Sequence, residues 1–139
     1  KIHLSHYLAG WFFYVTVNLH PLLCYLAEPR YQSIDYRYLL ILPPFLLASV
    51  DQYRNHLYLS RLVKYNIPKE GLFRYVCCAH YLDEIIIYLC YSVVLQTFTA
   101  LLILLWVIVN LSMSANQSYK FYEERKKDGK WWRILPFIY

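Results

Sequence analysis

The sequence has 139 residues, a length that suits one domain. Apolar residues make up 59% of it and charged residues only 17%, and its formal net charge is +5. A soluble domain averages about 45–50% apolar and about 25% charged residues, so this composition excludes an ordinary soluble protein. We predict one membrane-embedded domain over residues 1–139, with an all-α fold in the form of a multi-spanning transmembrane helical bundle.

About four membrane helices are expected, two of them in the first half of the chain. Residues 7–27 contain no formal charge and are long enough to cross a bilayer, with a kink expected at Pro21. Residues 38–50 are apolar again, and Pro43-Pro44 should bend or interrupt that helix because proline lacks a backbone donor. The polar residues of 51–62 then indicate that the helix leaves the lipid or lines a wet cavity.

The second half contains a longer apolar run. The 29 residues from Ile85 to Met113 carry no formal charge. A single helix of this length would measure roughly 43 Å, whereas the hydrocarbon core of a bilayer is ~30 Å thick. We therefore predict two helices that form a hairpin turning near Gln96–Thr99, with one long tilted helix as the alternative.

Basic residues flank this hairpin on both sides. They are concentrated in 54–74 and in the tail from 120 onward, whereas the connector at 28–37 holds equal numbers of acidic and basic residues. The positive-inside rule then places the basic 61–80 loop and the C-terminal tail in the cytoplasm, with Lys64 and Lys127 on the same side. These basic residues are also candidates for contact with membrane lipids or with a nucleotide phosphate.

The cysteines and motifs exclude several other classes. Cys77 and Cys78 are adjacent, which does not indicate a disulfide framework, and with His80 they lack the second ligand pair of a structural zinc site. We predict no metal, and thiols that are reduced and packed as small apolar groups. No GxGxxG, Walker, HExxH or GxSxG motif occurs, so a soluble nucleotide-binding fold is not indicated and no nucleic-acid partner is expected.

Two pairs of polar residues lie one helical turn apart. Gln52 and His56 share a helix face, and so do His80 and Glu84. Ionisable groups at membrane depth usually face a cavity, so both pairs are candidates for a ligand site, although a helix end in the headgroups would also explain Gln52 and His56. We interpret His80 and Glu84 as the polar end of a pocket for an anionic cofactor, and Asp83 as a helix-start residue favoured by the helix dipole.

Two stretches carry a resemblance to a known family. IPKEGLFRYVCCAHYLDEI (67–85) and YKFYEERKKDGKWWRILPFIY (119–139) resemble the C-terminal half of the steroid 5-alpha-reductase family. The shared features are Ile-Pro, Gly, Tyr-Val and Glu-Ile in the first stretch, and the closing Tyr, the basic segment and Pro-Phe in the second. HYLAGWFFY and DQYRNHLYLSRL look closer to the polyprenol (polyprenal) reductase branch, in its fungal form. The resemblance covers almost the whole chain.

The resemblance implies an activity and a set of cofactor-binding residues. The activity is NADPH-dependent saturation of the alpha-isoprene double bond of a polyprenyl substrate, polyprenal or polyprenol, in the endoplasmic reticulum membrane. The product feeds dolichol synthesis and so protein N-glycosylation. The implied cofactor-binding residues are Gln52, His56, Tyr65, Asn66, His80, Glu84, Asn116 and Tyr119.

These residues match the family to different degrees. Gln52 and His56 fall where the steroid branch has an Asn and an Asp that contact NADPH. Tyr65-Asn66 falls where the steroid branch has Tyr-Arg. His80 replaces a common Asn, and both side chains can hydrogen-bond an amide or a ribose. Glu84 matches a Glu of the family, and Tyr119 matches a Tyr that binds the cofactor there. Asn116 lies near the position where the family usually has a His. Without the resemblance, Asn116 and Tyr119 would be read as ordinary interfacial anchors.

The catalytic group is not assigned. The family's substrate-polarising acid and tyrosine belong to its N-terminal half, and we expect this chain to be the C-terminal part of a longer protein. A sterol double-bond reductase or an isoprenylcysteine methyltransferase of the same membrane fold is an alternative enzyme, and a membrane assembly subunit is a non-enzymatic alternative. The isoprene chain length, the choice between aldehyde and alcohol, and the oligomeric state stay open.

Overall fold

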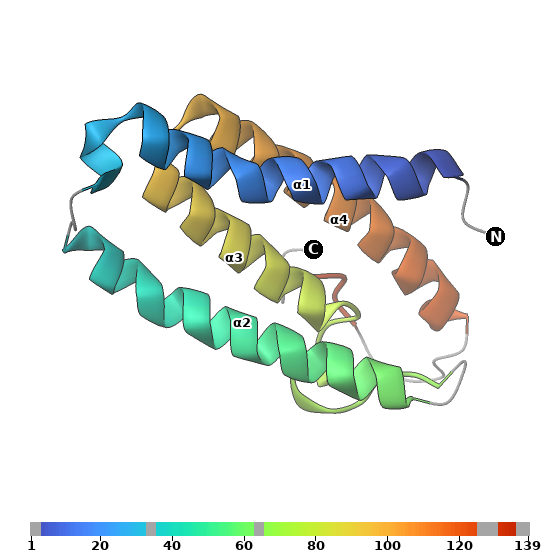
Figure 1. The fold of residues 1–139 in the computed structure, drawn as a ribbon. Helices are drawn as coiled ribbons and strands as arrows, with labels where there is room; N and C mark the ends of the chain where they lie inside the picture. The colour runs from blue at the N-terminus through green and yellow to red at the C-terminus, as the bar shows by residue number, and fades with distance from the viewer. Residues whose placement is uncertain (1–3, 33–35, 63–65, 125–130, 136–139) are drawn as a thin grey trace. The chain divides into compact units, whose positions relative to one another are not determined.

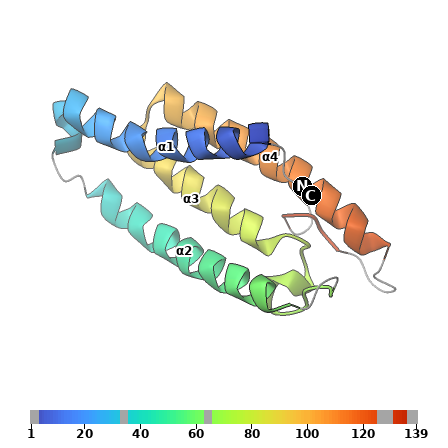
Figure 2. The same ribbon diagram turned by 45° about the vertical axis from the view of Figure 1, so that its right-hand side comes forward.

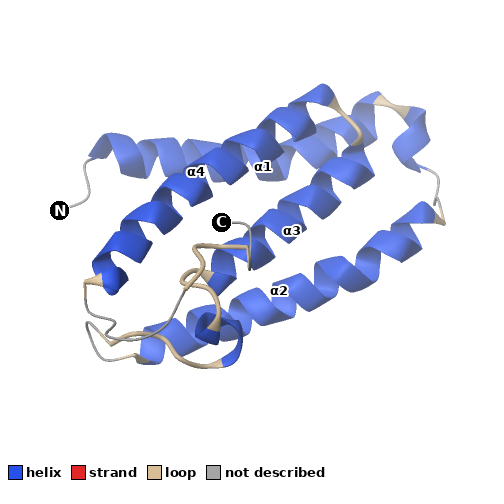
Figure 3. Ribbon diagram, turned by 180° about the vertical axis from the view of Figure 1, so that it is seen from behind, coloured by secondary structure: helices blue, strands red, loops and turns tan. Residues whose placement is uncertain are grey.

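The computed structural model describes residues 4–32, 36–62, 66–124 and 131–135. These ranges contain the helices α1 (Leu4–Ala27), α2 (Arg37–Arg61), α3 (Ala79–Leu95) and α4 (Phe98–Glu123), and two 3-10 turns at Pro29–Gln32 and Gly71–Arg74 (Figure 1). Figure 3 shows helices and loops but no strand in the part of the chain that is described. The predicted all-α class is confirmed. The chain divides into two compact units, residues 1–39 and 40–139, which are considered separately.

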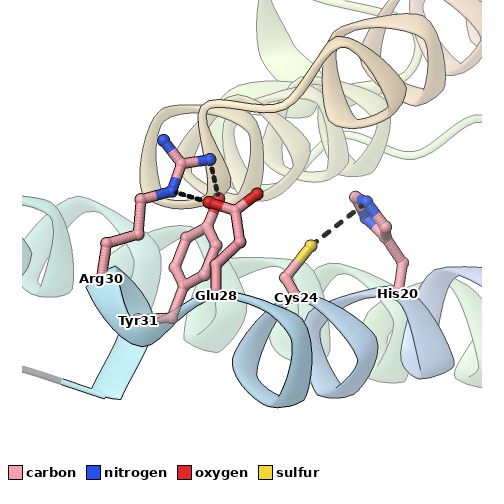
Figure 4. Close-up of polar contacts among 5 residues, drawn as sticks. All are labelled: His20, Cys24, Glu28, Arg30 and Tyr31. Atoms are coloured by element: carbon pink, nitrogen blue, oxygen red, sulfur yellow. Dashed lines mark hydrogen bonds and ion pairs between the residues drawn. The ribbon is translucent and has the colours of Figure 1, made fainter.

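The first unit consists mainly of α1 and the 3-10 turn that follows it. Many of the large apolar side chains of α1 are exposed, including Trp11 and Phe12, at 63% and 69%. Polar contacts hold the turn (Figure 4): Arg30 pairs with Glu28, and its Nη2 donates to the Tyr31 hydroxyl at 2.8 Å. The turn therefore depends on residues close together in sequence.

Helix α2 begins in the first unit and continues through the second. It runs unbroken through Pro43 and Pro44, so of the two expected outcomes the interruption is wrong and the bend stays a prediction. Both prolines lie past the first turn of α2, where each removes one hydrogen bond of the helix, although the φ of proline itself is compatible with a helix. The helix then extends through the polar residues to Arg61 as one element.

Helices α3 and α4 pack against each other as a hairpin, and Figures 1 and 2 both show them lying side by side. Helix α3 ends at Leu95, and Gln96 adopts a left-handed conformation with φ 48°. Thr97 caps α4, because its Oγ1 accepts a hydrogen bond of 3.1 Å from the Ala100 amide. The predicted turn at Gln96–Thr99 is confirmed, and the single long helix is wrong.

Helix α4 has one buried stripe and one exposed apolar face. The buried stripe consists of Ala100, Leu104, Val107, Leu111 and Ala115, spaced three or four residues apart. The exposed face includes Phe98 at 74%, Trp106 at 63% and Met113 at 63%. By length and composition, α4 is the one helix in the described ranges that is suited to cross a membrane. The multi-spanning bundle therefore remains a prediction.

The loop between α2 and α3 pairs with the C-terminal segment, defined here as residues 131–135. Val76 and Trp132 form a parallel bridge, in which the Cys77 amide donates to the Trp132 carbonyl at 2.7 Å. Trp132 in turn donates to the Tyr75 carbonyl at 3.0 Å. In Figures 1 and 2 this segment lies beside the start of α3. It therefore holds the loop that leads into the helix carrying His80.

Candidate functional site

The side chain of His80 lies among aromatic rings at the start of α3. Its ring centre is 4.2 Å from that of Tyr81, 5.2 Å from that of His56 and 5.9 Å from that of Phe73. Its Nδ1 atom is buried and has no hydrogen-bond partner among the described residues. A buried polar atom without a partner is unfavourable, so this atom is suited to receive a polar group of a ligand.

The structure brings His56 and His80 together from α2 and α3, as expected if both serve one site. Glu84 lies one turn after His80, is half-buried and interacts electrostatically with His56. Gln52 lies one turn before His56 and is also half-buried, whereas His56 is exposed. These residues form the first group of the candidate site.

Asp83 has a different environment from the one predicted. It is 4% exposed, and its Oδ2 accepts a hydrogen bond of 2.7 Å from Asn55 on α2. Asn55 Nδ2 also lies 3.4 Å from Asp51 Oδ2. The interpretation of Asp83 as a helix-start residue is therefore wrong, because it lies beyond the first turn of α3 and joins two helices. Of these two contacts, only the one between Asp51 and Asn55 could be expected from the sequence, because the two residues have i, i+4 spacing on one helix.

A second group of site candidates lies on the C-terminal part of α4. Asn116 Oδ1 accepts a hydrogen bond of 3.1 Å from Nε of Arg133, and the Arg133 guanidinium carbon lies 4.7 Å from the centre of the Tyr119 ring. The Tyr119 hydroxyl donates to Glu123 at 3.2 Å. Asn116 and Tyr119 are thus brought together by Arg133, which the sequence interpretation counted only as one basic residue of the tail.

A buried cluster connects the two groups. It contains Cys77, Cys78, Ala115, Trp131 and Ile134, and both Tyr81 and Tyr119 pack against it. Cys77 and Cys78 are reduced, and their sulfurs lie 3.6 Å apart. The contact with Cys77 lowers the pKa of the Cys78 thiol, against the opposing effect of burial. Burial within this cluster agrees with the prediction that both cysteines pack as reduced apolar groups.

The two groups contain six of the eight predicted site residues, and the other two are Tyr65 and Asn66. Asn66 is exposed, and Tyr65 lies outside the described residues, as do Lys64 and Lys127. Four described basic side chains in the 54–74 segment are also exposed, namely Arg54, Arg61, Lys69 and Arg74.

The two groups have the chemistry that a dinucleotide requires. Imidazole, carboxylate and amide side chains hydrogen-bond ribose hydroxyls and a carboxamide, and a guanidinium pairs with phosphate oxygens. The Nδ1 atom of His80, which has no partner in the part of the chain that the structure describes, provides an available position for such a contact. The described residues therefore fit a nicotinamide dinucleotide.

Comparison with known proteins gives a consistent result. The chain is 39% identical to the polyprenal reductase of Saccharomyces cerevisiae over 140 residues, covering 99% of this chain and 53% of that protein. It is 28% identical to the polyprenal reductase of Xenopus tropicalis over 159 residues, covering 99% and 52%. The polyprenal reductase of Drosophila melanogaster is 29% identical over 160 residues, covering 99% and 49%.

The chain therefore spans about half the length of the curated relatives it matches. The family model described as 3-oxo-5-alpha-steroid 4-dehydrogenase matches residues 3–139. This match extends over both groups of the candidate site and over the C-terminal segment. The chain belongs to the 3-oxo-5-alpha-steroid 4-dehydrogenase family, as the resemblance predicted.

Proposed function

We propose that this chain is the cofactor-binding half of an NADPH-dependent reductase that saturates the alpha-isoprene double bond of a polyprenyl substrate. The substrate class is supported by the three relatives named polyprenal reductase. The cofactor site is supported by one observation above all, the packing of His80 from α3 against His56 from α2 beside an unpartnered Nδ1. In this proposal the reaction belongs to dolichol synthesis for protein N-glycosylation.

NADPH supplies the hydride when it is bound. His80 Nδ1 and the Glu84 carboxylate are the groups that would hold its carboxamide and ribose hydroxyls. Asn116, Tyr119 and Arg133 would hold a second part of the same cofactor. The donor that polarises the substrate carbonyl is expected in the remainder of a longer protein, as the sequence interpretation proposed.

The proposed location is the endoplasmic reticulum membrane, with several membrane crossings in one domain. Support comes from the exposed apolar face of α4 and from its antiparallel pairing with α3. The basic loop and tail would lie on the cytoplasmic side, where a soluble dinucleotide is available. A polyprenyl lipid would instead approach from the bilayer, so the two substrates would enter from different directions.

The test uses the full-length protein that contains this chain, reconstituted in lipid nanodiscs with polyprenal and NADPH. Mass spectrometry should detect a product with two additional hydrogens at the alpha-isoprene unit. The polyprenal reductase of Saccharomyces cerevisiae is the positive control under the same conditions. A folded preparation that forms no saturated product, while the control does, would exclude the proposed reaction.

A further inference from the structure

Cys77 and Cys78 form an adjacent pair of thiols outside the two groups of the candidate site. The two residues are 1% and 2% exposed, and their sulfurs lie 3.6 Å apart. The Cys77 amide donates to the Trp132 carbonyl at 2.7 Å. The Cys78 amide donates to the Arg133 carbonyl at 3.0 Å. The backbone of the pair therefore joins the start of α3 to the C-terminal segment.

The two thiols are not equivalent. Cys78 is the N-cap residue of α3, and its thiol is hydrogen-bonded to Cys77 and to Ser118 of α4. The contact with Cys77 lowers the pKa of the Cys78 thiol against the opposing effect of burial, and Ser118 lowers it further. A helix N-terminus also favours the thiolate, which is the reactive form of cysteine. Cys78 is therefore suited to react first, with the sulfur of Cys77 beside it to complete the reaction.

A disulfide between these residues would close across a single peptide bond. Neighbouring Cα atoms are about 3.8 Å apart across a trans peptide, whereas residues linked by a disulfide usually have Cα atoms ~4.4–6.8 Å apart. The backbone between Cys77 and Cys78 must therefore rearrange to close the bond. The two amides that donate to the C-terminal segment belong to this backbone. Disulfide formation thus opposes the pairing of Cys77 and Cys78 with Trp132 and Arg133.

We propose that Cys77 and Cys78 are a reversible oxidation site at which hydrogen peroxide produces a disulfide that releases the C-terminal segment. The Cys78 thiolate attacks one peroxide oxygen and becomes a sulfenic acid, while the O–O bond breaks and hydroxide leaves with the proton that Cys78 lost. The Cys77 thiol then attacks the Cys78 sulfur, so the S–S bond forms, the S–O bond breaks and water leaves. The two thiols lose two electrons and two protons, and one peroxide becomes two water molecules.

The C-terminal segment controls both access to the thiols and the consequence of their oxidation. Both thiols pack with Trp131 and Ile134 in the buried cluster, so peroxide reaches them when the segment opens locally. His80 is the second residue of α3, two positions after Cys78. Release of the segment removes the pairing that holds the start of α3, so the cofactor should bind more weakly. This last step rests on the proposed function.

The experiment treats the full-length protein in detergent with hydrogen peroxide and maps its thiols by alkylation and peptide mass spectrometry. The peptide that contains Cys77 and Cys78 should lose two hydrogens and resist alkylation, and dithiothreitol should restore both thiols. On oxidation, the amides of Cys77, Cys78 and Trp132 should lose protection from hydrogen exchange. NADPH binding, measured by cofactor fluorescence, should weaken about tenfold and recover on reduction.

Three variants separate this response from general damage by peroxide. Cys77→Ala should form no disulfide and should stop at a sulfenic acid on Cys78, which dimedone traps. Cys78→Ala should give no oxidised product at Cys77. Cys90→Ala is the matched control, since Cys90 is also a buried cysteine of α3, and it should respond as the wild type does. Hydrogen exchange equal to that of the wild type before oxidation shows that each variant is folded.

Other outcomes would overturn the proposal. Full alkylation of Cys77 and Cys78 after peroxide treatment would exclude the oxidation site. A disulfide that leaves the amides of Cys77, Cys78 and Trp132 protected would exclude the release of the C-terminal segment. If oxidation removes this protection but the reduced wild type binds no NADPH, the oxidation site is supported and the proposed function is refuted.

Discussion

Asn55 on α2 donates a hydrogen bond of 2.7 Å to Asp83 on α3, and both side chains are buried. The residues that follow them in sequence are His56 and Glu84, which belong to the first group of the candidate site. The buried contact thus fixes the separation of two helices next to the residues expected to bind the cofactor. The contact therefore supports the first group of the candidate site from the interface of the two helices.

Removal of this contact should destabilise the protein. Asp83→Ala leaves the buried amide of Asn55 without its closest partner, which should cost about 1–3 kcal/mol of unfolding free energy. Thermal unfolding of the full-length protein in detergent measures the change. Asp51→Ala should have a smaller effect, because its contact with Asn55 is longer, at 3.4 Å. Equal unfolding temperatures for wild type and Asp83→Ala would contradict this interpretation.

Glu84 should act on cofactor binding and not mainly on stability. Glu84→Ala should raise the Michaelis constant for NADPH and lower the turnover number, because a carboxylate that accepts from a ribose hydroxyl or carboxamide is lost. Glu84→Gln keeps an acceptor oxygen and should be milder. The measurement is reductase activity against NADPH concentration for the full-length variants.

Asp83→Asn is the matched control for Glu84. It retains an oxygen that can accept from Asn55, and it should leave the Michaelis constant for NADPH close to the wild-type value. If Asp83→Asn loses cofactor affinity while Glu84→Ala resembles wild type, the site lies on the other face of α3.

Trp131 should stabilise the loop that leads into α3. Its indole Nε1 donates to the Phe73 carbonyl at 2.8 Å, and the Phe73 ring lies 5.9 Å from that of His80. Trp131→Phe keeps an aromatic ring but removes the donor, and should lower the unfolding free energy by roughly 1 kcal/mol. Trp106→Phe, on the exposed face of α4, is the control and should have little effect. Equal losses of stability in the two variants would argue against a specific role for the indole donor.

The hairpin predicts a membrane topology that is open to chemical labelling. In a cysteine-free background, single cysteines at Lys69 and Glu124 should react with an impermeant maleimide from the same side of sealed microsomes. A cysteine at Gln96 should react only after the membrane is permeabilised. The sequence prediction that Lys64 and Lys127 lie on the same side of the membrane can be tested in the same way, although both residues lie outside the described residues. Labelling of Lys69 and Glu124 from opposite sides would refute two crossings.

Local features of the fold were predictable because their causes are local. The turn at Gln96–Thr99 follows from the excess length of an uncharged segment and from the capping side chain of Thr97. Helix α4 continues to Glu123, well beyond the end of the uncharged run at Met113, because residues 114–123 are mostly polar or aromatic but contain neither Gly nor Pro. Polarity marked the end of the apolar surface, which is not the end of the helix.

Contacts between distant residues were not predictable in the same way. Asn55 and Asp83 are separated by 28 positions, and Asn116 and Arg133 by 17. Neither pair shares a helix, so spacing along one helix carries no information about them. Spacing along each helix and the family resemblance indicated His56 and His80 as candidates, and the structure supplied the contact between their rings.

The pairing of Trp132 with residues 75–77 also has a consequence for the order of folding. The Trp131 indole and its Phe73 acceptor are 58 positions apart, and the whole α3–α4 hairpin lies between them. A hairpin with local contacts forms before a pairing that closes so long a loop. The amides of Cys77, Cys78 and Trp132 should therefore become protected from hydrogen exchange after the helices do, and should be the first to exchange when the native protein opens. The groups of the candidate site would then come together as the final event of folding.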